Sequence, residues 1–239
     1  MGRNGKMGDM VINSTYLNEA IEVRWYLPEG FTPFKDYTIC YVQDGNDYFQ
    51  IGRMATISDR LHEEMLIEPT IFVGIHYQNK IDRRKKYHPD GELHEAYVTF
   101  LMREVIPQVE NHLHVEPVAR ALMGDSLAGT FAFIVASMYP STFQKVIMQS
   151  PFVNDIVLEQ AKTMDHTSVV IYHSIGLEET IVHTTDGQKS DFLTPNRVLN
   201  QILNEKNFTY HYEEFNGDHT WTYWQKDLAK IIEWMFREV

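Results

Sequence analysis

The chain has 239 residues, of which 44% are hydrophobic, and a formal net charge of −12 at pH 7. This composition is ordinary for a globular protein and supplies enough apolar side chains for a buried core. The acidic charge argues against a nucleic-acid partner, because binding a phosphate backbone needs clustered Lys and Arg. No run approaches the ~18 uninterrupted apolar residues of a membrane span, so no membrane partner is expected.

The N-terminus and the cysteine content together predict a cytoplasmic protein. Residues 1–9 are polar and lack the apolar stretch of a secretory signal. Cys40 is the only cysteine, so no internal disulfide can form. It lies in a strand-like run, where the expected role is that of a small core residue. The sequence leaves the oligomeric state open, with a homodimer as one option.

Predicted strands and helices alternate along the chain. Strands are expected at residues 19–26, 37–43, 70–75, 119–124, 145–149, 168–173 and 209–214. Helices are expected at residues 52–64, 92–113, 127–138, 154–162, 195–204 and 221–238. This alternation predicts an α/β fold with a mostly parallel central sheet and helices on both faces. No linker or repeat interrupts the pattern, so residues 1–239 are expected to form one domain.

The motif that indicates chemistry is Met-Gly-Asp-Ser-Leu-Ala-Gly at residues 123–129. A Gly-x-Ser-x-small pattern is weak alone, but this one follows a predicted strand and opens an apolar helix, where a nucleophile elbow must lie. Small residues on both sides of the serine let the sharp turn close. Ser126 is therefore the candidate nucleophile, and the Leu127 backbone N–H is a candidate oxyanion donor. The structural alternative is an ordinary helix start capped by Asp125 or Ser126.

A general base for this serine is expected in the loop between the last strand and the last helix. His219 lies there, within Phe-Asn-Gly-Asp-His-Thr-Trp. In α/β-hydrolases the order along the chain is Ser, acid, His. Loops at the carboxyl edge of an open parallel sheet gather such groups. His219 is therefore predicted to be the general base of Ser126.

The acid of the triad should follow the preceding strand. Glu178 and Glu179 come first in that loop, with Asp186 and Asp191 behind them, and the topology alone leaves these candidates open. A second oxyanion donor is expected after the second predicted strand. There, a glycine lets the backbone turn inward and present the Asn46 N–H.

A series of short motifs runs in order along nearly the whole chain. They are Tyr-Val-Gln-Asp-Gly-Asn at 41–46, Phe-Val-Gly-Ile at 72–75, Arg-Arg-Lys-Lys-Tyr-His-Pro at 83–89, Glu-Val-Ile-Pro at 104–107, the elbow at 124–129, Gly-Leu-Glu-Glu at 176–179, Asn-Arg at 196–197 and Gly-Asp-His-Thr-Trp-Thr-Tyr-Trp at 217–224. Together they resemble the putative-esterase family of esterase D, feruloyl esterases, antigen 85 and the enterochelin esterases.

This resemblance implies a triad of Ser126, His219 and an acid three residues after Gly176, hence Glu179. It also implies backbone oxyanion donors at Asn46 and Leu127. One departure is an alanine at position 128, where most members have glycine.

The basic run at residues 80–86 is expected to be a solvated loop or one wall of a pocket. Siderophore esterases place an arginine near an anionic substrate, and this chain has Arg83 in the corresponding segment. Arg83 and Phe152 are therefore the candidate substrate-binding residues. Trp221 and Trp224, three apart on a predicted helix, are expected in the core rather than in a pocket.

The sequence predicts a serine carboxylic-ester hydrolase that acts through an acyl-enzyme on small or short-acyl esters, with no cofactor or metal. Residues 174–194 are the longest strand-free stretch near the active face, and they are too short and polar for a lipase-type lid. The alternatives are a trilactone siderophore esterase, an acyl transferase like antigen 85, and a non-catalytic interaction protein on the same fold. A metallohydrolase fits least, because residues 62–64 lack the second histidine of a zincin helix and residues 112–114 have no companion ligand.

Overall fold

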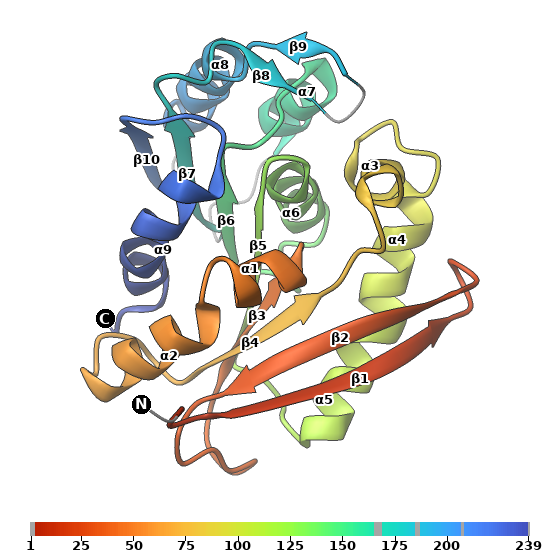
Figure 1. The fold of residues 1–239 in the computed structure, drawn as a ribbon, viewed down its shortest axis with the longest axis vertical. Helices are drawn as coiled ribbons and strands as arrows, with labels where there is room; N and C mark the ends of the chain where they lie inside the picture. The colour runs from red at the N-terminus through yellow and green to blue at the C-terminus, as the bar shows by residue number, and fades with distance from the viewer. Residues whose placement is uncertain (1–2, 165–168, 185–186, 207, 239) are drawn as a thin grey trace.

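The computed structural model describes residues 3–164, 169–184, 187–206 and 208–238. Within these residues the chain forms an eight-stranded sheet in the order β1-β2-β4-β3-β5-β6-β7-β10 (Figure 1). Its strands are β1 Lys6–Ser14, β2 Glu19–Leu27, β3 Thr38–Val42, β4 Thr70–Ile75, β5 Ala119–Asp125, β6 Lys145–Gln149, β7 Val170–Gly176 and β10 Thr209–Phe215. Pairing is parallel from β4 across to β10, whereas β1 and β2 join the sheet antiparallel.

Side chains of the central strands alternate between two cores, one on each face of the sheet. On β3, Ile39 and Tyr41 belong to one core, while Cys40 and Val42 belong to the other. This alternation follows from the period of two residues along an extended strand. Because Cys40 is fully buried, its prediction as a core residue is confirmed.

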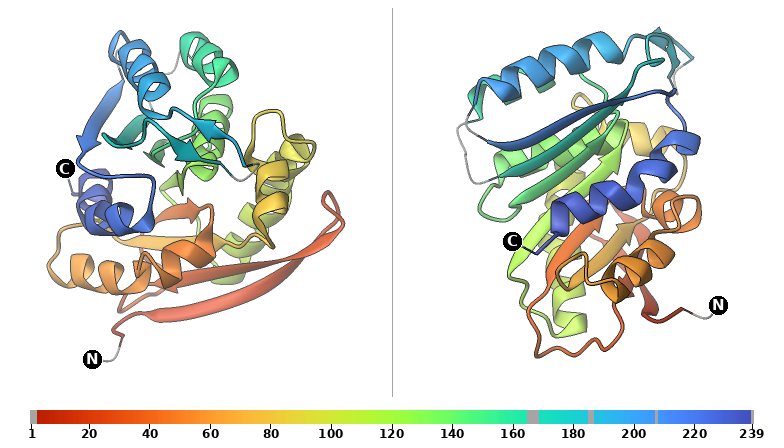
Figure 2. Two further views of the ribbon diagram at one scale, coloured as in Figure 1. Left: turned by 45° about the horizontal axis from the view of Figure 1, so that its top comes forward. Right: turned by 90° about the vertical axis from the view of Figure 1, so that its left-hand side faces the viewer.

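Helices cover both faces of this sheet (Figure 2). Helices α4 to α8 contribute to the first core, and α1, α2 and α9 contribute to the second. The helices are α1 Gly45–Gln50, α2 Met54–Glu63, α3 Lys80–Tyr87, α4 His94–Phe100, α5 Ile106–Leu113, α6 Leu127–Met138, α7 Asp155–Thr163, α8 Leu193–Asn204 and α9 Trp221–Phe236. The predicted α/β fold, with a mostly parallel sheet between helices, is confirmed.

Most predicted elements agree with the structure to within a few residues. Helix α6 and strands β4 and β6 have the predicted bounds. The long helix expected at residues 92–113 consists of α4, a π-helical segment at Leu101–Val105 and α5. The strand expected from residue 168 begins at Val170, and residue 168 itself lies outside the described residues.

Several elements were not expected from the sequence. Strand β1 forms in the polar N-terminal segment, and the six-residue helix α1 forms where only a turn was expected. The basic run at residues 80–86 is helix α3 rather than a loop, and the Asn79 side chain caps it by accepting the Ile81 and Asp82 N–H groups. A small hairpin, β8 Val182–His183 and β9 Lys189–Ser190, lies inside the stretch expected to be strand-free, so that prediction was wrong.

Within the described residues, none of the helices has both the length and the apolar character needed to cross a membrane.

Candidate active site

Ser126 lies in the sharp turn between β5 and α6. Its backbone has φ 51° and ψ −126°, a strained conformation for a residue with a side chain. The turn closes only because its neighbours are small: a Cβ atom on Gly124 would lie 2.4 Å from the carbonyl carbon of Ala128. The Ser126 N–H donates to the Gln149 carbonyl on β6 over 2.9 Å, which anchors the turn to the sheet. The local sequence therefore builds the predicted elbow.

His219 reaches Ser126 from the loop between β10 and α9. Its Nε2 lies 3.0 Å from Ser126 Oγ, and its Nδ1 lies 2.6 Å from Glu179 Oε2. Glu179 belongs to the loop that follows β7. Strands β5, β7 and β10 run parallel, so the loops after them meet at one edge of the sheet.

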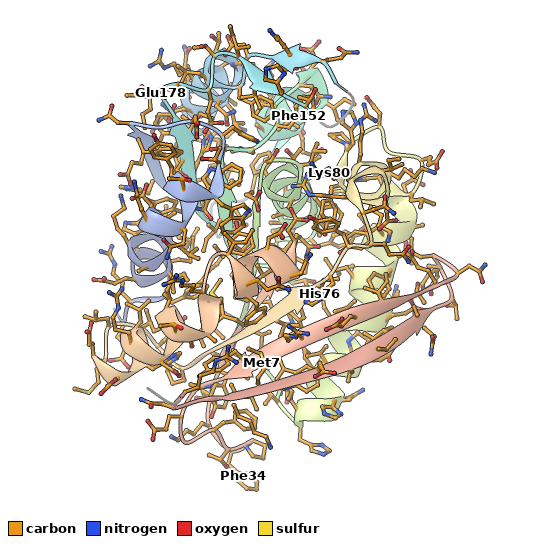
Figure 3. All side chains as sticks on the ribbon, in the orientation of Figure 1. Met7, Phe34, His76, Lys80, Phe152 and Glu178 are labelled. Atoms are coloured by element: carbon orange, nitrogen blue, oxygen red, sulfur yellow. The ribbon has the colours of Figure 1, made fainter. Side chains whose placement is uncertain are left out.

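The two adjacent glutamates have opposite environments. Glu178 is exposed at the outer rim of the molecule (Figure 3), whereas Glu179 is fully buried. Asp191 is exposed and accepts a hydrogen bond from the Thr194 N–H near the start of α8. Asp186 lies outside the described residues. Among the candidates that the structure does describe, Glu179 is the one in contact with His219.

Both carboxylate oxygens of Glu179 have partners. Oε2 faces His219, while Oε1 accepts from the Ser150 hydroxyl over 2.6 Å and from the Gly176 N–H over 2.8 Å. The Ser150 hydroxyl in turn accepts from Trp224 Nε1 over 3.0 Å. These neutral donors offset the cost of burying a carboxylate and fix its direction. The arrangement suits a carboxylate that orients an imidazole.

Two aromatic rings pack edge-on against the imidazole of His219. The ring centre of Phe192 lies 4.6 Å from that of His219, and the ring centre of Trp224 lies 4.8 Å away. Trp224 is buried but also lines the cavity above Ser126, so the prediction of a core role without a pocket role was wrong for this residue. Trp221 instead packs edge-on against Tyr48.

The two candidate oxyanion donors lie in the first turns of helices. Leu127 begins α6 and Asn46 is the second residue of α1, so neither N–H has a helical carbonyl partner four residues earlier. The positive end of the helix dipole adds to their attraction for an anion. Helix α1 packs closely against β4 at Gly45. A Cβ atom at this position would lie 2.3 Å from the Gly74 Cα, so only glycine fits there.

A cavity of about 400 Å³ opens above Ser126. Four of its lining residues, here called the aromatic wall, are Phe152, Phe192, His219 and Trp224. The charged lining residues, here called the charged wall, are Asp44, Asp47, Lys80, Arg83, Arg84 and Asp125. Figure 3 labels one side chain from each wall, Phe152 and Lys80, at this end of the molecule. The β8–β9 hairpin also contributes to the lining, through residues such as Val182 and Ser190.

Both candidate substrate-binding residues line this cavity, and their substrate contacts stay predictions. Phe152 follows β6, and its carbonyl accepts a hydrogen bond from the Thr130 hydroxyl over 2.7 Å. Arg83 is almost fully buried and pairs with Asp44 over 2.6 Å. Burial raises the pKa of the Asp125 carboxyl well above its usual value, and the nearby Asp44 raises it further, while Arg83 opposes the shift. Burial also raises the pKa of the Asp44 carboxyl, and Arg83 opposes that shift as well.

Among the described residues, no group of three or more His, Cys, Asp and Glu side chains is arranged to hold a metal ion.

The family of this chain follows from its sequence as a whole. A family model described as putative esterase matches residues 14–235. The chain belongs to the putative esterase family. Membership of this family supports ester hydrolysis as the class of reaction.

Relatives and solved structures agree with the family. The chain is 40% identical over 236 residues to the uncharacterized protein YjcH of Bacillus subtilis (strain 168), covering 98% of each chain. It is 24% identical over 153 residues to the ferri-bacillibactin esterase BesA of the same organism, covering 53% of this chain and 52% of BesA.

A ferulic acid esterase and an enterobactin esterase, both solved structures, share the fold of this chain. A ferulic acid esterase has a TM-score of 0.77 at 18% identity, covering 97% of this chain and 98% of its own. The enterobactin esterase of Shigella flexneri has a TM-score of 0.81 at 16% identity, covering 95% of this chain and 58% of its own. At these identities the similarity concerns the fold alone.

Proposed function

We propose that this protein hydrolyses carboxylic esters through a covalent acyl-enzyme on Ser126. The observation that carries the proposal is the unbroken pair of hydrogen bonds from Ser126 through His219 to Glu179, 3.0 and 2.6 Å long. A nucleophile within reach of a base, which is itself oriented by a third group, is the arrangement that activates a serine. The strained backbone of Ser126, which exposes its hydroxyl to the cavity, supports the same role.

In the acylation step, Ser126 Oγ attacks the ester carbonyl carbon and its proton passes to His219 Nε2. The carboxylate of Glu179 stabilises the imidazolium that forms. The carbonyl oxygen takes the negative charge and accepts hydrogen bonds from the backbone N–H groups of Leu127 and Asn46. When the carbon–oxygen bond to the leaving group breaks, His219 returns the proton to the departing alcohol.

Deacylation repeats these steps with water as the nucleophile. His219 takes a proton from the water, whose oxygen attacks the acyl carbon. The tetrahedral state then collapses, the proton returns to Ser126 Oγ, and the carboxylic acid leaves. No cofactor enters either step of this proposed reaction.

Small or short-acyl esters are the proposed substrates. The cavity of about 400 Å³ lies at the small end of the range that ligand pockets span, about 300–1,000 Å³. A second candidate is a trilactone siderophore esterase, supported by the similarity to the ferri-bacillibactin esterase and by the cationic Lys80 and Arg84 of the charged wall. Carboxylates on the same wall, such as Asp47, weigh against a highly anionic substrate.

The test of the proposed function is the activity of Ser126→Ala. Hydrolysis of p-nitrophenyl esters should fall on the order of 10³-fold or more while the fold is retained. Ser141→Ala, at an exposed serine in the loop after α6, should remain active. A fluorophosphonate should label the wild-type protein and Ser141→Ala but not Ser126→Ala, and labelling that persists in Ser126→Ala would contradict the proposal. A ferric trilactone assayed beside the simple esters decides between the two substrate classes.

A further inference from the structure

A buried arginine joins two loops that flank the elbow. Arg83 lies on α3, and 10% of its side chain is exposed. Its Nε donates to Asp44 Oδ2 over 2.7 Å, and its Nη2 donates to the backbone oxygen of Asp125 over 3.2 Å. Asp44 follows β3 and Asp125 ends β5, and these two strands are parallel neighbours in the sheet. One guanidinium therefore ties together their carboxyl ends.

Each of these contacts lies next to a candidate oxyanion donor. Asp44 is in the left-handed region, with φ 54°, and it is the N-cap residue directly before α1, whose second residue is Asn46. The Asp125 oxygen belongs to the peptide bond that leads into Ser126, and Leu127 follows directly. A change in either contact would therefore move the backbone that carries a donor N–H.

Helix α3 holds the Asp44 loop at a second point. The Asp44 N–H donates to the Tyr87 hydroxyl over 3.4 Å, a long contact. Tyr87 is buried, and the Arg83 guanidinium lies 5.6 Å from the centre of its ring. The same helix thus contacts both the side chain and the backbone of Asp44.

Stability alone does not account for this cluster. Burying an ion pair costs desolvation energy, and well-packed apolar residues often replace such pairs without loss of stability. Asp44 Oδ1 and Asp125 Oδ1 are buried with no hydrogen-bond partner among the described residues, which adds to the cost. Two of the donors of Arg83 already bind the protein rather than face a ligand. The cluster is therefore best explained by its effect on the backbone, which it holds in one geometry at Asp44 and Asp125.

We propose that Arg83 is a positioning residue of the oxyanion hole. Through Asp44 and the Asp125 carbonyl it fixes the Asn46 and Leu127 N–H groups relative to each other. This inference rests on the proposed function, because an oxyanion forms only when Ser126 attacks an ester carbonyl. Such donors are effective because they are held in place before the reaction, and a displacement of about 1 Å can cost about 100-fold in rate.

The variant Arg83→Gln removes the guanidinium and keeps a polar side chain. We expect kcat for p-nitrophenyl acetate to fall about 10- to 100-fold while KM changes less than about three-fold, because the donors contact the oxyanion more strongly than the ground-state ester. Affinity for a boronic acid that mimics the tetrahedral state should fall by a similar factor. Arg83→Lys, which can restore one bond to Asp44, should recover part of the lost kcat.

Arg120 provides a matched control at the opposite end of β5. Its Nε and Nη2 pair with the two carboxylate oxygens of Glu110 over 2.6 and 2.7 Å. Arg120→Gln breaks an ion pair of the same kind and should lower the unfolding midpoint without lowering kcat. For Arg83→Gln, a raised KM with unchanged kcat would make the residue a substrate ligand. Unchanged kcat and KM would remove its positioning role, and either result overturns the proposal.

Asp44→Asn keeps the test decisive if Arg83→Gln fails to fold. This variant retains the shape of the side chain and weakens the same pair, so kcat should again fall with little change in KM. Wild-type kcat in a folded Asp44→Asn protein would contradict the proposal.

Amide hydrogen exchange separates this inference from the proposed function. Arg83→Gln should speed exchange in residues 44–50 and 126–130, and Arg120→Gln should not, whether or not the protein hydrolyses esters. A wild-type protein that turns over no ester and takes no fluorophosphonate label contradicts the proposed function. Unchanged exchange in Arg83→Gln, in a protein whose wild type is active, contradicts the positioning role alone.

Discussion

The two walls of the cavity bury carboxyl groups beside Ser126 in different ways. Next to the aromatic wall, the fully buried Glu179 contacts His219 with one oxygen and has two neutral donors on the other. On the charged wall, Asp44 and Asp125 share the single guanidinium of Arg83, and one oxygen of each has no hydrogen-bond partner among the described residues.

This difference separates two uses of a buried carboxyl group. A carboxylate with every oxygen satisfied can hold an imidazolium in one orientation. Burial raises the pKa of both carboxyls that share the Arg83 guanidinium, and the arginine opposes the shift in each. The Glu179 arrangement suits proton transfer through His219. The arrangement of Asp44 and Asp125 on Arg83 suits fixing the backbone on either side of Ser126.

The largest expected effect comes from Glu179→Gln. The amide cannot stabilise the imidazolium and favours the wrong tautomer of His219, so kcat should fall about 10⁴-fold. The substitution is nearly isosteric, and the protein should remain folded. The kcat for p-nitrophenyl acetate measures the loss of activity, and the urea midpoint of the same variant shows whether it remains folded.

Glu178→Gln is the control for this substitution, because its side chain is exposed and lies next to Glu179 in the chain. Its kcat should stay within a few-fold of wild type. A larger drop in Glu178→Gln than in Glu179→Gln would shift the assignment by one residue. A drop confined to Asp186→Asn would place the acid later in the same loop.

The next largest effect concerns a buried base near the aromatic wall. His173 on β7 is fully buried, with Nε2 2.6 Å from Asn196 Oδ1 and Nδ1 2.9 Å from the Tyr210 hydroxyl. Asn196 also donates to the Pro151 carbonyl, which precedes Phe152. Burial lowers the pKa of His173 from 6.5 to about 4, and the hydrogen bond with Asn196 opposes this shift only in part.

This shift predicts a loss of stability in acid. The folded protein does not take up the proton that the unfolded chain binds below pH ~6.5, so stability is complete above that pH and falls as the pH drops toward 4. At about 1.4 kcal/mol per pH unit, the loss from His173 is about 3 kcal/mol. Urea unfolding between pH 7 and pH 4 measures it.

His173→Gln should flatten that pH dependence, because glutamine does not titrate in this range. Burial also lowers the pKa of His62, His76 and His94, so part of the dependence should remain. His183→Gln, at an exposed histidine, should follow the wild-type curve. If His173→Gln loses as much stability in acid as the wild type, His173 is not the group responsible.

A smaller effect is expected from the acyl chain of the substrate. We expect the cavity of about 400 Å³ to hold a short acyl group together with the alcohol, and a palmitoyl chain to exceed its volume. Overfilling a packed site costs about 1–3 kcal/mol, so kcat/KM should fall about 10-fold or more between butyrate and palmitate. Phe152→Ala enlarges the cavity and should move the acyl-chain length of highest kcat/KM to longer chains. A rate that climbs steadily from butyrate to palmitate would contradict the short-acyl preference.

The smallest expected effect comes from the charged wall. Asp125 ionises in the unfolded chain at neutral pH, whereas burial in the folded protein raises the pKa of its carboxyl and disfavours the charged form. Its contribution to stability is therefore present in acid and is lost as the pH rises. Asp125→Asn removes this cost and should raise stability at pH 7 by about 0.5–2 kcal/mol, with less gain near pH 4. Lower stability of Asp125→Asn at pH 7 would show that the buried carboxyl is ionised.

Long elements with strong patterns could be predicted from the sequence. Strand β4 consists mostly of β-branched and aromatic residues, and α6 is mostly apolar, so the predicted bounds of both elements were correct. Helix α1 is too short to show a helical period, and α3 carries mostly charged residues, so neither has a clear local signal. The β8–β9 hairpin has two residues in each strand, which is also too short for a pattern.

The sequence by itself determined the elbow, because the strained turn at Ser126 depends on neighbours within a few residues that must be small. It also indicated the loops from which a base and an acid would come, since these follow from the order of strands. The tertiary structure alone decided that Glu179 is buried while Glu178 is exposed. It also decided that Arg83 pairs with Asp44, a residue 39 positions away. Such contacts depend on how distant strands and helices pack, and no local pattern of residues encodes that packing.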